Sequence, residues 1–181
     1  MTLREGSDPA DELVDIVDDD DIVVMAVPRR RLRAERLRHR VVFVVVVGGD
    51  GRLLVHRRSA DKDLWPGHWD VAAGGVVASS EGWIAAAERE LGEELGVAGP
   101  LVEVGRGRFD DAEVAEIARC YRIVHDGPFE LRDGEVAEVR WVDRTELAEL
   151  QAEEPFVPDS RALLDPNMLF PLPPPADTQE G

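Results

Sequence analysis

The segment from Gly75 to Val97 constrains the fold and the chemistry of this chain more than any other part of the sequence. It is GVVASSEGWIAAAERELGEELGV. From Trp83 to Leu95 the apolar residues recur with helical spacing, and Gly96 is the residue type at which helices commonly end. The apolar face of the predicted helix consists of Ile84, Ala87, Leu91 and Leu95. We therefore predict one amphipathic helix that follows a glycine-containing turn.

Three glutamates of this helix are predicted to form a second, acidic face. Glu90, Glu93 and Glu94 stand at positions i, i+3 and i+4, which are neighbours on a helix surface. Their like charges repel one another, and a hard divalent cation such as Mg²⁺, which prefers oxygen ligands, offsets that repulsion. Gly74 and Gly75 permit backbone conformations closed to other residues, so a main-chain carbonyl can turn toward the same ions. This pattern predicts a divalent metal site.

The spacing of the whole segment decides between a metal site and the alternative, a solvated acidic helix face. Arg89 and Glu81 are placed to pair across the loop before the helix and to hold the carboxylates. The segment fits the Nudix box at every defined position, and at ordinary residue usage such a match arises by chance at fewer than about one in 10⁸ start points. On this segment the chain resembles the Nudix hydrolases.

The resemblance extends beyond the box to three other parts of the sequence. The β-branched and aromatic run at 41–47, the WPGHW segment at 65–69 and the late Trp141 lie where the family has similar residues. The fold implied is α/β, a Nudix-type α/β/α sandwich with a mixed β-sheet. The activity implied is hydrolysis, dependent on Mg²⁺ or Mn²⁺, of a small-molecule diphosphate whose other group is often a nucleoside.

The resemblance also implies roles for individual residues. The implied metal ligands are Glu90, Glu93, Glu94 and the main-chain carbonyl of Gly75. Glu90 is also a candidate general base, and Arg89 and Glu81 are expected to orient the ligands. The implied catalytic residues are Glu90, Glu93, Glu94 and Arg89. Many family members use one more carboxylate from a later loop or strand, for which Glu135 is the candidate.

A narrower resemblance concerns the segment LLVHRRSADKDLWPGHW, which is similar to the diphosphate-binding region of isopentenyl diphosphate isomerase. It implies that Arg58 and Lys62 bind substrate phosphates, whereas the alternative is an ordinary solvated turn. The isomerase needs a cysteine and a histidine where this chain has Gly74 and Val76. Of its later pair of glutamates, only the second is present, as Glu116. Isomerase activity therefore stays an alternative function, together with a non-catalytic Nudix-fold binding module.

Hydrophobic patterning divides the chain into four predicted regions. These are a disordered N-terminus at 1–10, a hairpin and basic helix at 11–36, the core domain at 37–150, and a proline-rich tail at 151–181 that wraps over the surface or is disordered at its end. The hairpin strands are predicted over 12–17 and 22–27. Core strands are predicted over 41–47, 52–57, 70–73, 101–109, 116–125 and 135–142, with a further helix over 144–151.

The charge balance limits the possible partners. With 21 basic and 38 acidic residues the net charge is −17, which excludes nucleic-acid binding through a global positive field. The exception to this acidic balance is the segment 28–40, PRRRLRAERLRHR, which has seven arginines and one glutamate. One interpretation is a solvated helix with Leu32 and Leu37 turned inward, and the other is a site for phosphates or a partner.

The remaining features concern location and assembly. No apolar run reaches the ~18 residues of a membrane span, and the N-terminal segment lacks the apolar region of a signal peptide. The single cysteine, Cys120, excludes an internal disulfide. We therefore expect a cytoplasmic protein without membrane partners, in which the hairpin extension offers an edge for a possible homodimer.

Overall fold

The computed structural model of the protein describes residues 9–131 and 134–170, in which runs of strands are separated by helices. In chain order they are a 3₁₀ turn Pro9–Asp11, β1 Leu13–Val17, β2 Val23–Pro28, α1 Arg29–Glu35, β3 His39–Val47, β4 Leu53–Arg58, β5 Trp69–Asp70, β6 Ala73–Val76, α2 Trp83–Leu95, β7 Val102–Asp110, β8 Ala115–Val124, β9 Val136–Val142, α3 Arg144–Glu153, α4 Pro158–Leu163 and α5 Pro166–Leu169. The strands and helices predicted for the core are present, apart from the differences given below.

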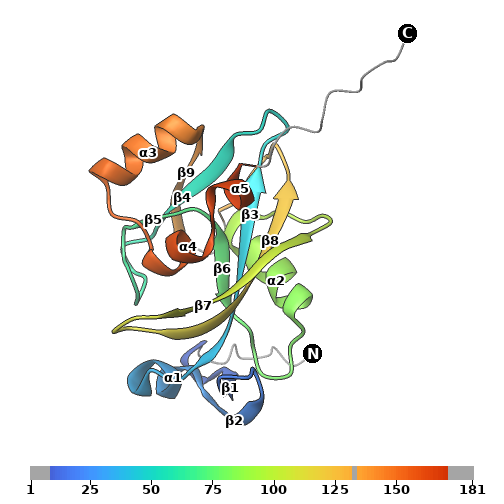
Figure 1. Cartoon of the computed structure of the whole chain (residues 1–181), viewed down its shortest axis with the longest axis vertical. Coiled ribbons are helices and arrows are strands. Elements are labelled where there is room, and N and C mark those ends of the chain that lie inside the picture. Colours follow the sequence, from blue (N-terminus) through green and yellow to red (C-terminus); the bar gives the residue numbers. More distant parts are fainter. Residues whose placement is uncertain (1–8, 132–133, 171–181) are drawn as a thin grey trace, which may run out of the picture.

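Within the described residues, nine strands form one mixed sheet in which β3 is the central strand (Figure 1). β3 pairs in parallel with β8 over its whole length and antiparallel with β6, while β4 pairs antiparallel with β9. Residues 41–47 are all buried. This burial on both faces explains why the run is continuously apolar rather than alternating.

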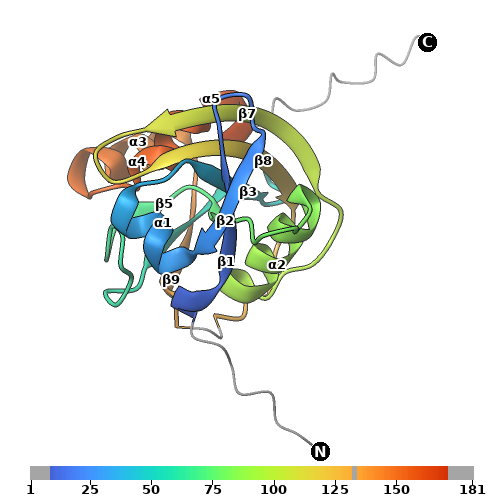
Figure 2. The same ribbon diagram turned by 90° about the horizontal axis from the view of Figure 1, so that it is seen from below.

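Helices cover the two faces of the sheet. Val42, Val44 and Val46 of β3 pack on one face with the apolar residues of α2. Val41, Val45 and other odd-numbered residues of β3 pack on the opposite face with residues of α3 and the segments that follow it. Figures 1 and 2 show α2 on one side of the sheet and α3, α4 and α5 on the other. The predicted α/β/α sandwich with a mixed sheet is confirmed.

The predicted hairpin and basic helix are also present, with different lengths. β1 and β2 pair antiparallel, and α1 follows directly. Leu32 of α1 is buried against this hairpin, and Leu37 packs partly buried beside it, as predicted. α1 ends early because Arg36 adopts a left-handed conformation with φ 49°, and the chain then enters β3 at His39.

The strand predicted over 70–73 is wrong. β5 ends at Asp70 and β6 begins at Ala73, and the two strands have different neighbours: β5 pairs with β4, whereas β6 pairs with β3. Val71 and Ala72 between them are buried. The chain crosses the sheet at this point, and the crossing brings the Gly74–Gly75 turn beside α2.

The C-terminal segment differs from the predicted surface tail. α4 and α5 pack Leu164, Leu169 and Phe170 into the core. Proline begins both helices, where a missing backbone N–H costs nothing, and the Asp165 carboxylate caps α5 by accepting from two backbone N–H groups. Residues 171–181 and 1–8 lie outside the described residues, and a 3₁₀ turn over Pro9–Asp11 stands where disorder was predicted.

Candidate active site

The glutamates of α2 lie in two different environments. Glu94 and Glu90 are 1% and 7% exposed and belong to the inward side of the helix, whereas the side chain of Glu93 is 55% exposed. The three glutamates are neighbours, as predicted, but the acidic face that they form is not uniformly solvated, because two of them turn toward the sheet. Ile84, which was assigned to the apolar face, is 46% exposed. Helical spacing identified the neighbours correctly but did not show which side of the helix turns toward the sheet.

Glycines 74 and 75 bring the backbone of β6 against these carboxylates. The Gly74 N–H donates to the Glu94 carboxylate at 3.2 Å. A Cβ atom at Gly75 would lie 2.4 Å to 2.6 Å from the carboxylate atoms of Glu90. Neither glycine has a positive φ. The site thus requires glycine at position 75 for close approach, not for the unusual backbone conformation expected from the sequence.

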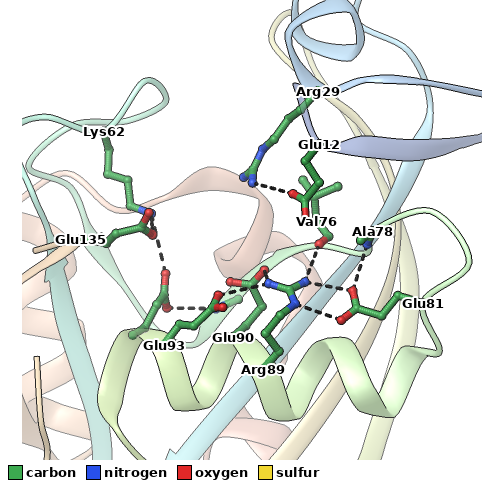
Figure 3. A network of polar contacts seen from close by, with 12 residues as sticks. Glu12, Arg29, Lys62, Val76, Ala78, Glu81, Arg89, Glu90, Glu93 and Glu135 are labelled. Atoms are coloured by element: carbon green, nitrogen blue, oxygen red, sulfur yellow. Dashed lines mark hydrogen bonds and ion pairs between the residues drawn. The ribbon is translucent and has the colours of Figure 1, made fainter. Parts of the chain in front are cut away.

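Arg89 connects the carboxylates to the preceding loop (Figure 3). Its Nε and Nη2 each donate to Glu81 at 2.9 Å, and Nη2 also donates to the carbonyl of Val76 at 3.1 Å. Its Nη1 donates to Glu90 at 2.7 Å and to Glu93 at 3.2 Å. The predicted contact between Arg89 and Glu81 is present, and one guanidinium group holds three carboxylates.

The electrostatics of the buried carboxylates follow from their desolvation. Burial raises the pKa of Glu94 well above its ordinary value, and the nearby Lys62 ammonium opposes that shift. Burial also raises the pKa of Glu90, against the opposing charge of Arg89. The hydrogen bonds from Arg89 lower the pKa of Glu81. Two carboxyl groups are therefore desolvated side by side, in an environment that favours an additional positive charge.

Lys62 joins these carboxylates to Glu135. Its Nζ forms an ion pair with Glu135 and lies 3.9 Å from Glu94 Oε1. Figure 3 shows Lys62 and Glu135 meeting above the carboxylates of α2. Arg58 is held in place from the same loop, since its Nε and Nη2 donate to the Leu64 carbonyl at 3.3 Å and 3.2 Å. The structure thus places the candidate phosphate-binding cations beside the candidate metal ligands.

A cavity of about 850 Å³ opens next to this cluster. The sequence-predicted residues that line it are Arg58, Lys62, Gly75 and Glu135. Other charged residues of its wall come from elements far apart in the chain. They include Arg29, Arg33, Asp70, Glu116 and Asp159. The sequence offered the arginines of 28–40 as a possible phosphate or partner site and Glu116 in the isomerase comparison, but it did not predict that these residues share a cavity. Spacing along the sequence carries no signal for such a set, because the fold alone brings these elements together.

The donor set fits a hard divalent cation in its chemistry. Every candidate ligand atom is an oxygen, and two of the carboxylates are buried with raised pKa values. Within residues 9–131 and 134–170, no group of three or more His, Cys, Asp or Glu side chains converges closely enough to enclose an ion. Here the Arg89 guanidinium lies between Glu90 and Glu93 and supplies the positive charge.

Comparisons with known proteins agree with this geometry. The family model described as NUDIX domain matches residues 37–165. The chain is 43% identical over 150 residues to the uncharacterized Nudix hydrolase YfcD of Salmonella typhi, covering 82% of this chain and 80% of that protein. It is 38% identical over 162 residues to the uncharacterized Nudix hydrolase PA4841 of Pseudomonas aeruginosa, covering 88% of this chain and 94% of that protein.

A solved structure is similar to this chain in fold. The crystal structure of DR0079 from Deinococcus radiodurans matches with a TM-score of 0.69 and 29% identity, covering 83% of this chain and 96% of that chain. These comparisons do not place the chain in the branch that includes isopentenyl diphosphate isomerase, to which the segment 53–69 is similar. Among the described helices, none combines the length and the apolar character needed to cross a bilayer.

Proposed function

The chain belongs to the Nudix hydrolase family, and from this we propose that it cleaves the diphosphate linkage of a nucleoside diphosphate derivative or a similar small organic diphosphate, with Mg²⁺ or Mn²⁺ as cofactor. The observation that carries the proposal is the burial of Glu90 and Glu94 against the glycine backbone of β6. Two desolvated carboxyl groups side by side are costly unless a cation joins them. Without a bound cation, this acidic site would also repel an anionic substrate.

The proposed ligands are the carboxylates of Glu90, Glu93 and Glu94 and the main-chain carbonyl of Gly75, with Glu135 as a further carboxylate. A bound divalent cation neutralises phosphate oxygens and lowers the pKa of a bound water. Arg89 acts on the ligands through its hydrogen bonds, because it fixes Glu90 and Glu93 relative to the loop that carries Glu81.

The residues of the chain itself perform the remaining tasks. Glu90 is the proposed general base, since its raised pKa makes the carboxylate a better proton acceptor than an ordinary surface glutamate. Arg58 and Lys62 line the cavity and bind the phosphate oxygens of the substrate. Their positive charge also opposes the repulsion between an acidic site and an anionic ligand.

The experiment combines a substrate screen with isosteric variants. Diphosphate compounds are incubated with Mg²⁺ or Mn²⁺, and the products are identified by mass. We expect Glu93→Gln and Glu94→Gln to abolish metal-dependent phosphate release while the fold is retained, because an amide keeps the shape of each side chain. The matched control is Glu88→Gln, an exposed position on the same helix, which should keep native activity.

The outcomes separate the proposed function from its alternatives. Native rates in both variants would contradict the assigned carboxylates. Rearrangement of isopentenyl diphosphate without release of phosphate would favour the isomerase, and tight binding of a diphosphate without turnover would favour the binding module. Each of these results would overturn the proposed hydrolysis.

A further inference from the structure

The N-terminal hairpin lies against the loop that precedes α2. The Ser79 N–H donates to the Leu13 carbonyl at 2.8 Å, and Val14 of β1 forms an isolated antiparallel bridge with Ala78. The hairpin precedes the Nudix domain, which begins at residue 37. The loop between β6 and α2 is therefore held by an element from outside the family domain.

Asp15 of β1 adds two side-chain contacts to this backbone pairing. Its Oδ1 accepts from the Ser79 hydroxyl at 2.6 Å, and its Oδ2 accepts from the Ser80 N–H at 3.2 Å. Ser80 adopts the left-handed conformation, with φ 65°. That conformation is unfavourable for a residue with a side chain and persists where surrounding contacts fix it. The Asp15 carboxylate supplies such a contact, because it binds the backbone N–H of Ser80 itself.

The loop held by Asp15 ends at the residue that binds Arg89. The Glu81 N–H donates to the Ala78 carbonyl at 3.0 Å. In return, the Ala78 N–H donates to the Glu81 carboxylate at 2.9 Å (Figure 3). These two bonds close a turn whose middle residues are the two serines that Asp15 contacts. The direction from which Glu81 meets Arg89 therefore depends on the conformation that Asp15 fixes.

A second connection runs through the apolar side of the hairpin. Val14 and Ile16 of β1 are buried in one cluster with Val76 of β6. The carbonyl of Val76 accepts from Arg89 Nη2 at 3.1 Å. The hairpin thus packs on one acceptor of the Arg89 guanidinium and, through Asp15, fixes the loop that carries another, Glu81.

We propose that Asp15 is a positioning residue of the active site: through the loop 78–81 and Arg89 it orients the carboxylates of α2. The inference rests on the proposed function, since it assigns Asp15 to the same metal site. Asp15 is not among the described residues that line the cavity, so it acts on the ligands rather than on the substrate. Loss of a residue that orients metal ligands typically lowers metal affinity or activity by about ten- to a hundredfold.

The test compares Asp15→Ala with a matched control, Asp18→Ala. Asp18 belongs to the turn of the same hairpin, and its Oδ1 accepts from the backbone N–H groups of Asp20 and Ile22 at 2.9 Å and 3.0 Å. Each variant therefore removes two hydrogen bonds from the hairpin, but of the two aspartates it is Asp15 that bonds the loop before α2. Both variants are studied well below their melting temperatures, so that general loss of stability does not enter.

The first measurement uses the metal-free protein, so it depends neither on turnover nor on a bound ion. The Arg89 Nε–H donates to Glu81 at 2.9 Å, and we expect its proton to be protected from exchange with water. Its NMR signal is identified by its absence in Arg89→Lys. Asp15→Ala should lose this protection, because the loop that carries Glu81 is released, and Asp18→Ala should keep it.

The second measurement is the affinity for Mn²⁺ alone, without substrate, read from the electron paramagnetic resonance signal of the free ion. We expect Asp15→Ala to bind Mn²⁺ about tenfold more weakly than the native protein, because Arg89 no longer fixes the carboxylates of α2 relative to the loop. Asp18→Ala should bind Mn²⁺ with the native affinity. A residue that merely stabilised the hairpin would not change this affinity in a folded protein.

The inference is overturned if Asp15→Ala keeps the protected Arg89 Nε–H, or if it binds Mn²⁺ as tightly as the native protein. It is also overturned if Asp18→Ala shows the same losses, since the effect would then come from the stability of the hairpin. Failure of the proposed function has a different signature. A native protein that neither binds Mn²⁺ nor hydrolyses a diphosphate would contradict that function, while the exchange measurement would still decide whether Asp15 positions Arg89.

Discussion

Arg89 and Glu81 are joined by two parallel hydrogen bonds, each 2.9 Å long, across a separation of eight residues. Glu81 also accepts from the Ala78 N–H at 2.9 Å, so the pair fixes the loop before α2 to the helix itself. The same guanidinium group donates to Glu90 and Glu93. The position of the candidate metal ligands therefore depends on a residue that need not touch the substrate.

This contact predicts the effect of Arg89→Lys. Lysine keeps the charge but lacks the planar fork that bonds Glu81 with two nitrogens. We expect activity to fall by about ten- to a hundredfold and the Mg²⁺ concentration for half-maximal activity to rise. Glu81→Gln should produce the same change in the metal titration. Arg52→Lys, at an exposed turn, serves as control. An unchanged metal titration in both site variants would show that the pair does not position the ligands.

A second prediction concerns the close approach of Gly75 and Glu90. In Gly75→Ala the new methyl group would lie within 2.6 Å of the carboxylate, so Glu90 has to move. We expect hydrolysis to fall at least about tenfold and the protein to lose about 1–3 kcal/mol of stability by overpacking. In Gly82→Ala the added methyl group meets nothing within 4 Å. Equal activities for the two variants would contradict the importance of this approach.

A third prediction follows from buried His56. Burial lowers its pKa to about 4 in the folded protein. The unfolded chain, with an ordinary pKa near 6.5, therefore binds the proton first as the pH falls, and stability is lost on going below about pH 6.5. The expected loss between pH 7 and pH 5 is about 2 kcal/mol from this group alone. Urea unfolding at both pH values measures it.

His56→Gln is the variant that isolates this contribution. Its unfolding free energy should change less between pH 7 and pH 5 than that of the native protein. The remaining slope should include His39, whose pKa burial also lowers to about 4. An identical pH dependence in the variant and the native protein would show that His56 is not buried as a neutral imidazole.

Local patterns predicted those parts of the fold whose signal lies within one element. The valine-rich β3 is recognisable because burial on both faces requires a continuous apolar run. The end of α2 at Gly96 is recognisable from the sequence because glycine favours the left-handed conformation at which helices end. Gly96 adopts that conformation, with φ 67°. α4 and α5 were missed although Asp165 and two prolines mark their starts, since prolines near a terminus also fit an irregular tail.

In the candidate site, too, the contacts within one local segment could be predicted and those that depend on tertiary packing could not. The spacing within the box correctly predicted that Arg89 contacts Glu81, because both residues belong to one loop and helix. It did not predict that Glu94 is almost fully buried, since the side of α2 that faces the sheet depends on tertiary packing. Arg33 of α1 and Glu116 of β8 line one cavity only because the fold brings together two elements that are far apart in the chain. No pattern along the sequence contains that relationship.

The most direct test of the account is the anomalous diffraction of crystals soaked in saturating Mn²⁺. We predict an anomalous peak coordinated by Glu90, Glu93 and Glu94, with the Gly75 carbonyl among its ligands. Collection just above and just below the manganese absorption edge identifies the ion. Well-diffracting crystals without an anomalous peak beside these three carboxylates would contradict the metal site on which the proposed hydrolysis depends.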